Sequence, residues 1–202
     1  MMLRGLYAIT PEQPDTEALA AKVEQALAAG AAVLQYRSKM LSREKRLAQA
    51  RRLAGLAQGY GVPFIVNDDV EIALAVGANG AHLGREDVAV AAARARLSGR
   101  ILGVSCYDSL ALARTAVAAG ADYVAFGSMF ASPTKPGAVR APLELFREAA
   151  PLGVPLAAIG GITVENAPLL IEAGAQLLAV ISDLFDAADI RARARQYANL
   201  FR

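Results

Sequence analysis

Residues 119–128 read Ala-Gly-Ala-Asp-Tyr-Val-Ala-Phe-Gly-Ser, in which a glycine at the end of a helical stretch is followed at once by a short apolar run. Gly is favoured just past a helix C-terminus because it adopts positive φ without a steric penalty. The same Gly-Ala step precedes three other apolar runs, at 29–31, 76–78 and 173–175. Four copies of one pattern predict a repeated unit of two strands and two helices.

Around this motif, strand-like runs alternate with alanine-rich helical stretches along the whole chain. Strands are expected at 6–10, 32–37, 64–68, 80–83, 101–106, 123–128, 156–162 and 177–182. Helices are expected near 15–29, 42–59, 69–76, 88–97, 109–119, 142–150 and 163–173, with a last one after Asp186. The strand runs are short and rich in Val, Ile and Leu, as in a parallel sheet that is buried on both faces.

The fold that these elements predict is an α/β (β/α)8 TIM barrel, formed by a single domain over residues 1–202. An open doubly wound sheet uses the same alternation, but the even spacing of the strands favours a closed barrel. The length lies near the lower end of the range for such barrels, about 200 to 250 residues. The sequence contains no evident linker or low-complexity tract.

Composition excludes several classes of function. The 21 Lys and Arg residues are dispersed and nearly balanced by 19 Asp and Glu, so no nucleic-acid partner is expected. No apolar run approaches the roughly 18 residues of a membrane span. One cysteine excludes an internal disulfide, and Pro11 and Pro14 interrupt the start before a secretory apolar core forms. We expect a cytoplasmic protein with no membrane partner, and a homo-oligomer is compatible with the sequence.

The end of the second strand carries the first candidate site residues. Active sites of such barrels lie at the C-terminal ends of the strands. Side chains alternate along a strand, so Gln35 and Arg37 share a face and Lys39 continues just beyond. A bound anion is the natural partner for these cations, because the segment contains no acidic residue and Arg suits phosphate geometry. The alternative is that they pair with acids of neighbouring loops.

Carboxylates follow the third and fourth strands. Asp68 ends one of these strands and Asp87 follows the next. Two carboxylates beside an Arg and Lys cluster predict Mg²⁺, held between protein oxygens and a phosphate. Asp69 and Glu86 are expected to be helix-start residues instead, since an Asp before a helix is an ordinary N-cap.

The loops after the later strands suggest a phosphate site. Ser132, Thr134 and Lys135 lie in a proline-stiffened loop that could bind phosphate oxygens, although a plain surface turn has the same composition. Gly160 and Gly161 end the seventh strand, where these barrels often bind phosphate and where glycine allows close approach of backbone N–H groups.

Two reactive residue types are expected to be structural. His82 is the only histidine and lies inside a strand, so we interpret it as a packed residue rather than an acid or base. Cys106 has no histidine near it in sequence and is interpreted as a small packed side chain. The sequence contains no Walker-type loop, paired-histidine metal motif or nucleophile elbow.

Taken in order along the chain, eight motifs resemble the thiamine-phosphate synthase (thiamine-phosphate pyrophosphorylase) family over nearly the whole length. The motifs are 6–10, 34–39, 66–69, 82–87, 103–106, 132–137, 158–162 and 180–182. The resemblance implies a transferase that joins 4-amino-2-methyl-5-(diphosphooxymethyl)pyrimidine to a thiazole phosphate, giving thiamine phosphate and pyrophosphate.

The resemblance also implies roles for individual residues. The pyrimidine diphosphate would be held by Gln35, Arg37, Lys39 and Asn67, with Ser105 on its pyrimidine side and Lys135 on the pyrophosphate. Asp68 and Asp87 would bind Mg²⁺. The thiazole phosphate would be held by Ser132, Thr134, Gly160 or Gly161, and the backbone of Ile181 and Ser182. The residues expected to act in catalysis are Arg37, Lys39, Ser105 and Lys135.

The chemistry of that family fits this residue inventory. The diphosphate leaves first, and the thiazole nitrogen attacks the resulting carbocation without needing a general base. Charge stabilisation on the diphosphate is what the reaction requires, and Mg²⁺, Arg and Lys supply it. One departure is Ser38, where many relatives carry Glu or Asp. Alternation places Ser38 away from Gln35 and Arg37, but the difference bears on the positioning of Lys39.

Three other functions share some of these features. A thiazole tautomerase-like relative would need an acid or base, and only His82 is available. A non-catalytic sensor would bind thiamine phosphate without turnover and without dependence on a metal. An unrelated sugar-phosphate isomerase or aldolase barrel would need an acid/base residue or a Schiff-base lysine within a strand, for which the sequence offers no convincing candidate.

Overall fold

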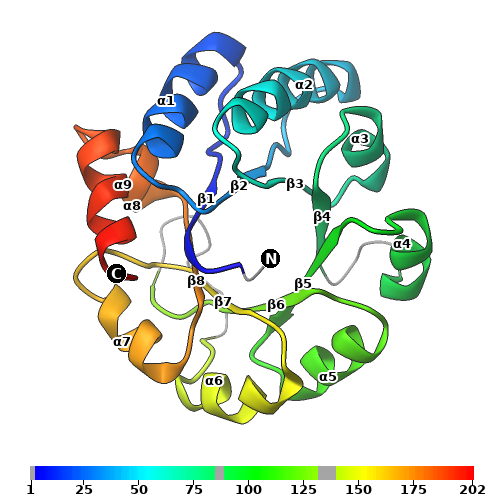
Figure 1. The fold of residues 1–202 in the computed structure, drawn as a ribbon, viewed down its shortest axis with the longest axis vertical. Coiled ribbons are helices and arrows are strands. Elements are labelled where there is room, and N and C mark those ends of the chain that lie inside the picture. Colours follow the sequence, from blue (N-terminus) through cyan, green and yellow to red (C-terminus); the bar gives the residue numbers. More distant parts are fainter. Residues whose placement is uncertain (1–2, 85–88, 132–139) are drawn as a thin grey trace.

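The protein forms a closed barrel of eight parallel strands, each next to its neighbour in the sequence, with β8 pairing back onto β1. The computed structural model describes residues 3–84, 89–131 and 140–202. Figure 1 shows the strands as a central ring with the helices outside it. The strands are β1 (Gly5–Ile9), β2 (Val33–Tyr36), β3 (Phe64–Asn67), β4 (Gly80–Leu83), β5 (Ile101–Tyr107), β6 (Tyr123–Phe126), β7 (Leu156–Ile159) and β8 (Leu177–Val180).

The helices return the chain along the outside of the barrel. They are α1 (Thr16–Ala28), α2 (Arg43–Gly59), α3 (Val70–Ala75), α4 (Val90–Arg96), α5 (Leu110–Ala118), α6 (Glu144–Ala149), α7 (Ala167–Ala173), α8 (Ser182–Phe185) and α9 (Ile190–Asn199), with a 3₁₀ turn at Ala150–Leu152. Side-chain N-caps start several of them, including Asp15 on α1 and Ser42 on α2. Such caps satisfy backbone N–H groups that have no partner within the helix.

Two hydrophobic cores hold the barrel together. The larger lies between strands and helices and accounts for the alanine-rich helix faces. The smaller fills the barrel interior, with Tyr7, Ile9 and Tyr123 among small side chains such as Ala125 and Ala157. Because the two tyrosines are large, small residues on other strands leave the space that their rings occupy.

The predicted (β/α)8 barrel is confirmed, and glycines end helices as expected. Gly30 and Gly120 have φ of 101° and 97°, in the left-handed region that favours glycine. Several predicted strands run too far, however, among them the sixth, which ends at Phe126 rather than at residue 128. β7 stops before Gly160 and Gly161, whose φ values of 101° and 64° break the extended conformation. β8 stops before residues 181–182, because Ser182 begins the short helix α8.

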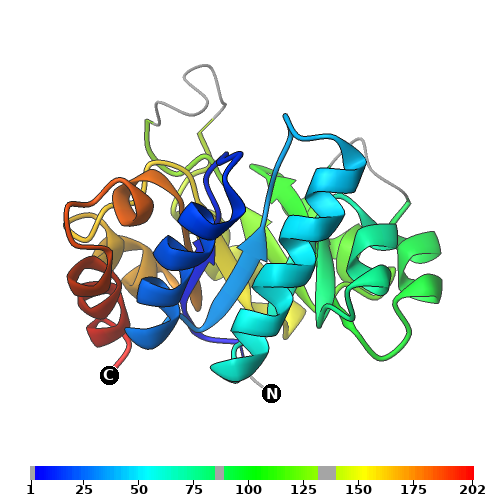
Figure 2. The ribbon, with the colours of Figure 1, turned by 90° about the horizontal axis from the view of Figure 1, so that it is seen from above.

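The two ends of the barrel differ in what they carry. In Figure 2 the connection from β2 to α2 rises at one face, while the C-terminus lies at the opposite face. Residues that follow the carboxyl ends of the strands therefore gather on the face where β2 connects to α2. Within the described segments, no helix combines the length and apolar character that crossing a membrane requires.

Candidate active site

Gln35 lies in β2, and Arg37 directly follows the last residue of that strand, Tyr36. Gln35 is only 2% exposed, and its Nε2 donates to the Tyr7 hydroxyl at 2.5 Å. The backbone of Arg37 is held by Thr10, whose Oγ1 accepts from Arg37 N at 2.9 Å and donates to Arg37 O at 3.2 Å. The ion pairs found among the described residues do not include Arg37. Within the described residues its guanidinium thus makes no salt bridge, and it interacts with the Glu12 carboxylate only at longer range.

Lys39 pairs with Asp68 of the segment after β3, which is the alternative that the sequence left open for this lysine; the pair also brings a predicted anion-binding lysine next to a predicted metal-binding carboxylate. The Lys39 Nζ donates to Asp68 Oδ2. The Lys39 and Asp68 side chains are 55% and 25% exposed. An exposed ion pair of this kind contributes about 0–1 kcal/mol, so exchanging it for contacts to a ligand costs little.

Glu12 holds the segment that carries Lys39. Its Oε1 accepts from the Ser38 hydroxyl at 2.5 Å and from Met40 N at 3.0 Å, and its Oε2 accepts from Lys39 N at 2.8 Å. Ser38 therefore has a direct structural partner, which an acidic side chain at that position would repel. Sequence reasoning missed Glu12, because it lies 26 residues from Ser38 on a different loop.

Asp68 has an unusual backbone conformation at the end of β3. Its φ is 63°, a value uncommon for a residue other than glycine but tolerated by Asp. Its N–H donates to the backbone oxygen of His82 at 2.8 Å. Asp69 accepts from Ile72 N at 2.9 Å and caps α3, which confirms its predicted helix-start role.

The donor chemistry at this place fits a hard divalent cation. Mg²⁺ keeps several waters and is usually bound by one or two carboxylates together with substrate phosphates. Asp68 supplies one carboxylate at the mouth. Its predicted partner Asp87 lies outside the described residues, as does Glu86. Within the described part of the chain, no group of three or more His, Cys, Asp or Glu side chains could hold a metal by itself.

Five side chains inside the barrel form what we call the interior hydrogen-bond network. Gln35 bonds to the Tyr7 hydroxyl, which lies 2.6 Å from the Tyr123 hydroxyl. The Tyr123 hydroxyl lies 2.9 Å from Nδ1 of His82, and Nε2 of His82 lies 2.8 Å from Oγ of Ser105. Burial lowers the pKa of His82 to about 4, against an opposing influence of Asp68. Burial also raises the pKa of both tyrosines, so the network is uncharged at neutral pH.

The network changes the interpretation of His82. It is buried as predicted, but both ring nitrogens make hydrogen bonds, one of them to the candidate substrate residue Ser105. Sequence reasoning missed Tyr7 and Tyr123 altogether. Alternation places Tyr7 on the face of Ile9, which was the available signal. The predicted packing of Cys106 is confirmed, since it is fully buried and burial raises the pKa of its thiol to about 12.

The glycines after β7 approach the chain that follows β6. Phe130 N donates to Gly160 O at 2.9 Å. A Cβ added at Gly160 would overlap Ser128, and one at Gly161 would overlap the backbone of Phe130 and Ala131. Both positions thus require glycine for space as well as for φ. Ser132, Thr134 and Lys135 lie outside the described residues.

The last predicted ligand site begins α8. Ile181 precedes the helix and Ser182 is its first residue. The neighbouring Asp183 is fixed by Arg193 Nη1 at 2.6 Å and by the Tyr197 hydroxyl at 2.7 Å, so α9 holds this turn in place. Asn67 ends β3 opposite His82 in the register of β4.

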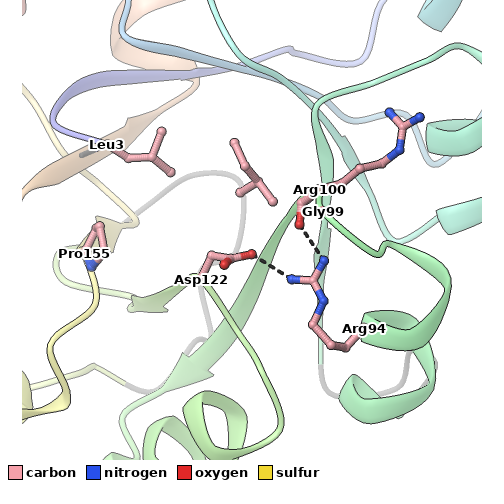
Figure 3. A pocket seen from close by; sticks show the side chains of 7 residues that line it. Leu3, Arg94, Gly99, Arg100, Asp122 and Pro155 are labelled. Carbon is pink, nitrogen blue, oxygen red and sulfur yellow. Dashed lines mark hydrogen bonds and ion pairs between the residues drawn. The ribbon is translucent and has the colours of Figure 1, made fainter. Parts of the chain in front are cut away.

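A hollow of about 520 Å³ lies at the other face, near the starts of the strands (Figure 3). Its cations already have partners from the chain itself. Arg94 donates to the backbone oxygens of Leu97, Gly120 and Arg100 and to Asp122. Contacts of this kind at the amino-terminal face of a barrel stabilise the fold, since active sites of such barrels lie at the opposite face. We assign the site to the opposite, carboxyl-end face.

The fold and this face define a (β/α)8 barrel that presents cations, a carboxylate and glycine-lined turns at the carboxyl ends of its strands. This arrangement is typical of barrel enzymes that act on phosphorylated small molecules. A family model described as thiamine monophosphate synthase matches residues 6–184. The chain belongs to the thiamine monophosphate synthase family, and it is an enzyme of the transferase class with thiamine-phosphate synthase activity.

Individual relatives agree with this assignment. A thiamine-phosphate synthase of Aromatoleum aromaticum is 61% identical over 98% of this chain and 97% of its own length. One of an Azoarcus species is 58% identical over 98% of each. The solved structure of a thiamine phosphate pyrophosphorylase from Pyrococcus furiosus has a TM-score of 0.86 at 34% identity, covering 98% of this chain and 95% of that one.

Proposed function

We propose that the carboxyl-end face joins 4-amino-2-methyl-5-(diphosphooxymethyl)pyrimidine to a thiazole phosphate, releasing pyrophosphate and forming thiamine phosphate. Membership of the family supports this reaction. The observation that supports its placement is the ion pair between Lys39 and Asp68, which joins the segments that follow β2 and β3, with Arg37 two residues before Lys39. The substrates are small molecules, and we propose that the enzyme works in the cytoplasm, as a single-domain protomer that is compatible with a homo-oligomer.

The pyrimidine diphosphate would occupy the side of the mouth formed by the ends of β2, β3 and β5. Arg37 and Lys39 would bind the diphosphate, with Lys39 exchanging Asp68 for phosphate oxygens. Gln35 and Ser105 would contact the pyrimidine, and Asn67 lies between them in strand order. Lys135 is proposed to meet the departing pyrophosphate.

The thiazole phosphate would bind at the turns after β6, β7 and β8. Gly160 and Gly161 have no side chains to block an anion from the backbone, and Ser182 starts α8 beside them in strand order. Ser132 and Thr134 are proposed to add hydroxyl donors. Ile181 would contribute through its backbone. The two substrates would thus enter from opposite sides of one mouth.

The reaction we propose begins with loss of the diphosphate from the pyrimidine methylene carbon. The bond to oxygen breaks with its electron pair, which leaves with the pyrophosphate, and the ring stabilises the resulting cation. The thiazole nitrogen then donates its lone pair to that carbon. No proton moves in this step, so the neutral state of His82 is compatible with it. Arg37 and Lys39 stabilise charge as it develops on the leaving group.

Mg²⁺ is the cofactor we propose, with Asp68 and Asp87 as its protein ligands. When bound, it would supply positive charge to the leaving diphosphate. The carboxylate of Asp68 would turn from Lys39 to the ion, which leaves the lysine free for phosphate.

Turnover of purified protein with both substrates and Mg²⁺ tests the proposal, with pyrophosphate and thiamine phosphate followed together. We expect EDTA to abolish product formation. Asp68→Ala should lower kcat by about 100- to 1,000-fold, by analogy with loss of one oxyanion contact. The matched control is Glu148→Ala, an exposed carboxylate on α6, which should leave kcat unchanged.

Several results would contradict the proposal. Metal-independent turnover, or equal activity of Asp68→Ala and the control, would remove the proposed metal site. Folded protein that binds thiamine phosphate without forming it would favour the sensor alternative. Isomerisation of a thiazole precursor in the absence of the pyrimidine would favour a tautomerase.

A further inference from the structure

We propose that Tyr7, Tyr123 and His82 are positioning residues that give the interior hydrogen-bond network one direction and so make Ser105 a hydrogen-bond donor toward the substrate. The inference rests on the proposed function for the identity of that substrate, the aminopyrimidine. The geometry that carries it is a continuous series of four hydrogen bonds between five side chains on five different strands.

The direction follows from counting protons, beginning at Gln35. Its amide nitrogen can only donate, so the oxygen of Tyr7 accepts. The Tyr7 hydroxyl proton then has one partner in the network, the oxygen of Tyr123. In the opposite arrangement Tyr7 would accept twice and its own proton would be left without a partner in a residue that is 1% exposed. A buried donor without a partner costs about 1–3 kcal/mol.

The same count of protons extends along the network to Ser105. Since Tyr123 accepts from Tyr7, its own proton goes to Nδ1 of His82. His82 is then the tautomer with hydrogen on Nε2, and it donates to Ser105 Oγ. The Ser105 hydroxyl has accepted within the network, so its proton is directed to a partner outside it. The network therefore ends in a donor.

Packing holds the network in one arrangement. Tyr123 and His82 are 0% and 6% exposed and stack with ring centroids 5.5 Å apart. Tyr7 meets Tyr123 edge to face at 5.9 Å. A Cβ added at Gly103 would overlap the Tyr123 hydroxyl, so the glycine on β5 provides the space where that hydroxyl lies. The hydroxyl is thereby fixed between its two partners.

The two ends of the network differ in hydrogen-bonding character. Because Gln35 donates inward through its amide nitrogen, its carbonyl oxygen remains as an acceptor. Ser105 provides a donor. An aminopyrimidine carries amino hydrogens, which need an acceptor, and ring nitrogens, which need a donor. The two ends of the network therefore match a ligand that both donates and accepts hydrogen bonds. A pyrimidine with a carbonyl group in place of the amino group would offer no amino hydrogen to the Gln35 carbonyl oxygen.

The tautomer of His82 can be measured without any substrate, so its test is independent of the proposed function. His82 is the only histidine, and ¹⁵N-histidine labelling of protein without a histidine tag gives one imidazole in a long-range ¹H–¹⁵N spectrum. We expect the neutral tautomer with hydrogen on Nε2. Hydrogen on Nδ1, which would follow from a reversed Gln35 amide, would overturn the inference.

Tyr123→Phe tests whether the direction is imposed by the network. The variant keeps the buried ring but removes the donor to His82, so we expect the Nδ1–H form to appear in its spectrum. Tyr197→Phe is the matched control, because it removes a buried hydroxyl outside the network and should leave the tautomer unchanged. An unchanged tautomer in Tyr123→Phe would overturn the inference.

Kinetics then test whether the network acts through Ser105. Tyr123→Phe should raise KM for the pyrimidine diphosphate roughly threefold to tenfold, the effect of one hydrogen bond, and leave KM for the thiazole phosphate unchanged. In a Ser105→Ala background the same substitution should have no further effect. An effect of equal size in both backgrounds, or on both substrates, would contradict a positioning role.

Discussion

Glu12 is an exposed residue whose carboxylate accepts three hydrogen bonds from the segment 38–40. A single side chain thus holds the backbone that carries Lys39. Partial burial acts to raise the pKa of the Glu12 carboxyl, but the bonds from Ser38, Lys39 and Met40, together with the positive charge of Arg37, outweigh burial, and the pKa is lowered. A carboxyl with a lowered pKa keeps its contacts above its ordinary pKa. It loses them only as pH falls through the lowered value.

Glu12→Gln should therefore weaken the positioning of Lys39. Replacing one carboxylate oxygen by an amide removes an acceptor, so we expect KM for the pyrimidine diphosphate to rise roughly threefold to tenfold, with KM for the thiazole phosphate unchanged. Steady-state kinetics with each substrate varied in turn measure both. Glu17→Gln, an exposed carboxylate that pairs with Arg52 on the outside of the barrel, is the control. Equal KM values in the two variants would show that Glu12 does not position the segment.

At the scale of elements, the turn that follows β7 is built around two glycines that cannot be replaced without strain. Gly160 combines a φ of 101° with a place where a Cβ would overlap Ser128. Its carbonyl also accepts from Phe130, so the turn and the chain after β6 are held together. A change here affects both backbone conformation and the neighbouring loop.

Gly160→Ala should lower the free energy of unfolding by about 1–3 kcal/mol, because left-handed backbone costs a non-glycine residue about 1–2 kcal/mol and the overlap adds to it. Urea unfolding measures the change. Gly55→Ala is the matched control, since Gly55 lies inside α2 with open space around it. That variant should gain about 0.5–1 kcal/mol. A loss of similar size in both would mean that the turn is not specially constrained.

At the scale of the whole molecule, contacts at the amino-terminal face of the barrel stabilise the fold, whereas the carboxyl-end face carries the candidate active site. Arg94 joins the start of β5 to the start of β6 by donating to Arg100 O at 2.6 Å and to Asp122 at 2.9 Å. Asp122 also accepts from Leu102 N at 2.7 Å. These bonds close the amino-terminal face, far along each strand from the candidate residues at the carboxyl ends.

Arg94→Ala should lower the free energy of unfolding by about 2–3 kcal/mol, because it leaves backbone oxygens without a donor. Since the side chain lies at the face opposite the mouth, kcat and both KM values should stay unchanged at temperatures where the variant is folded. Arg114→Ala, on the exposed face of α5, should change stability by less than about 0.5 kcal/mol. Altered KM with normal stability would contradict this division.

Local sequence patterns allowed much of the barrel to be predicted. The strand at 80–83 has the predicted bounds, because this short segment lies between the helix-ending Gly77 and Gly84. Strand ends were the weaker part of the prediction. Gly160 looked like part of an apolar run, and its positive φ depends on the approach of the chain after β6, which no local pattern shows.

The sequence by itself determined the alternation of strands and helices, the positions of residues such as Arg37 and Asp68 at strand ends, and the family. Only the tertiary structure decided which side chains meet. Tyr7 and Tyr123 are 116 residues apart, and Tyr123 and His82 are 41 apart. A hydrogen bond depends on distance and direction to within a fraction of an ångström, and across a barrel these are set by strand register and interior packing rather than by spacing along the chain.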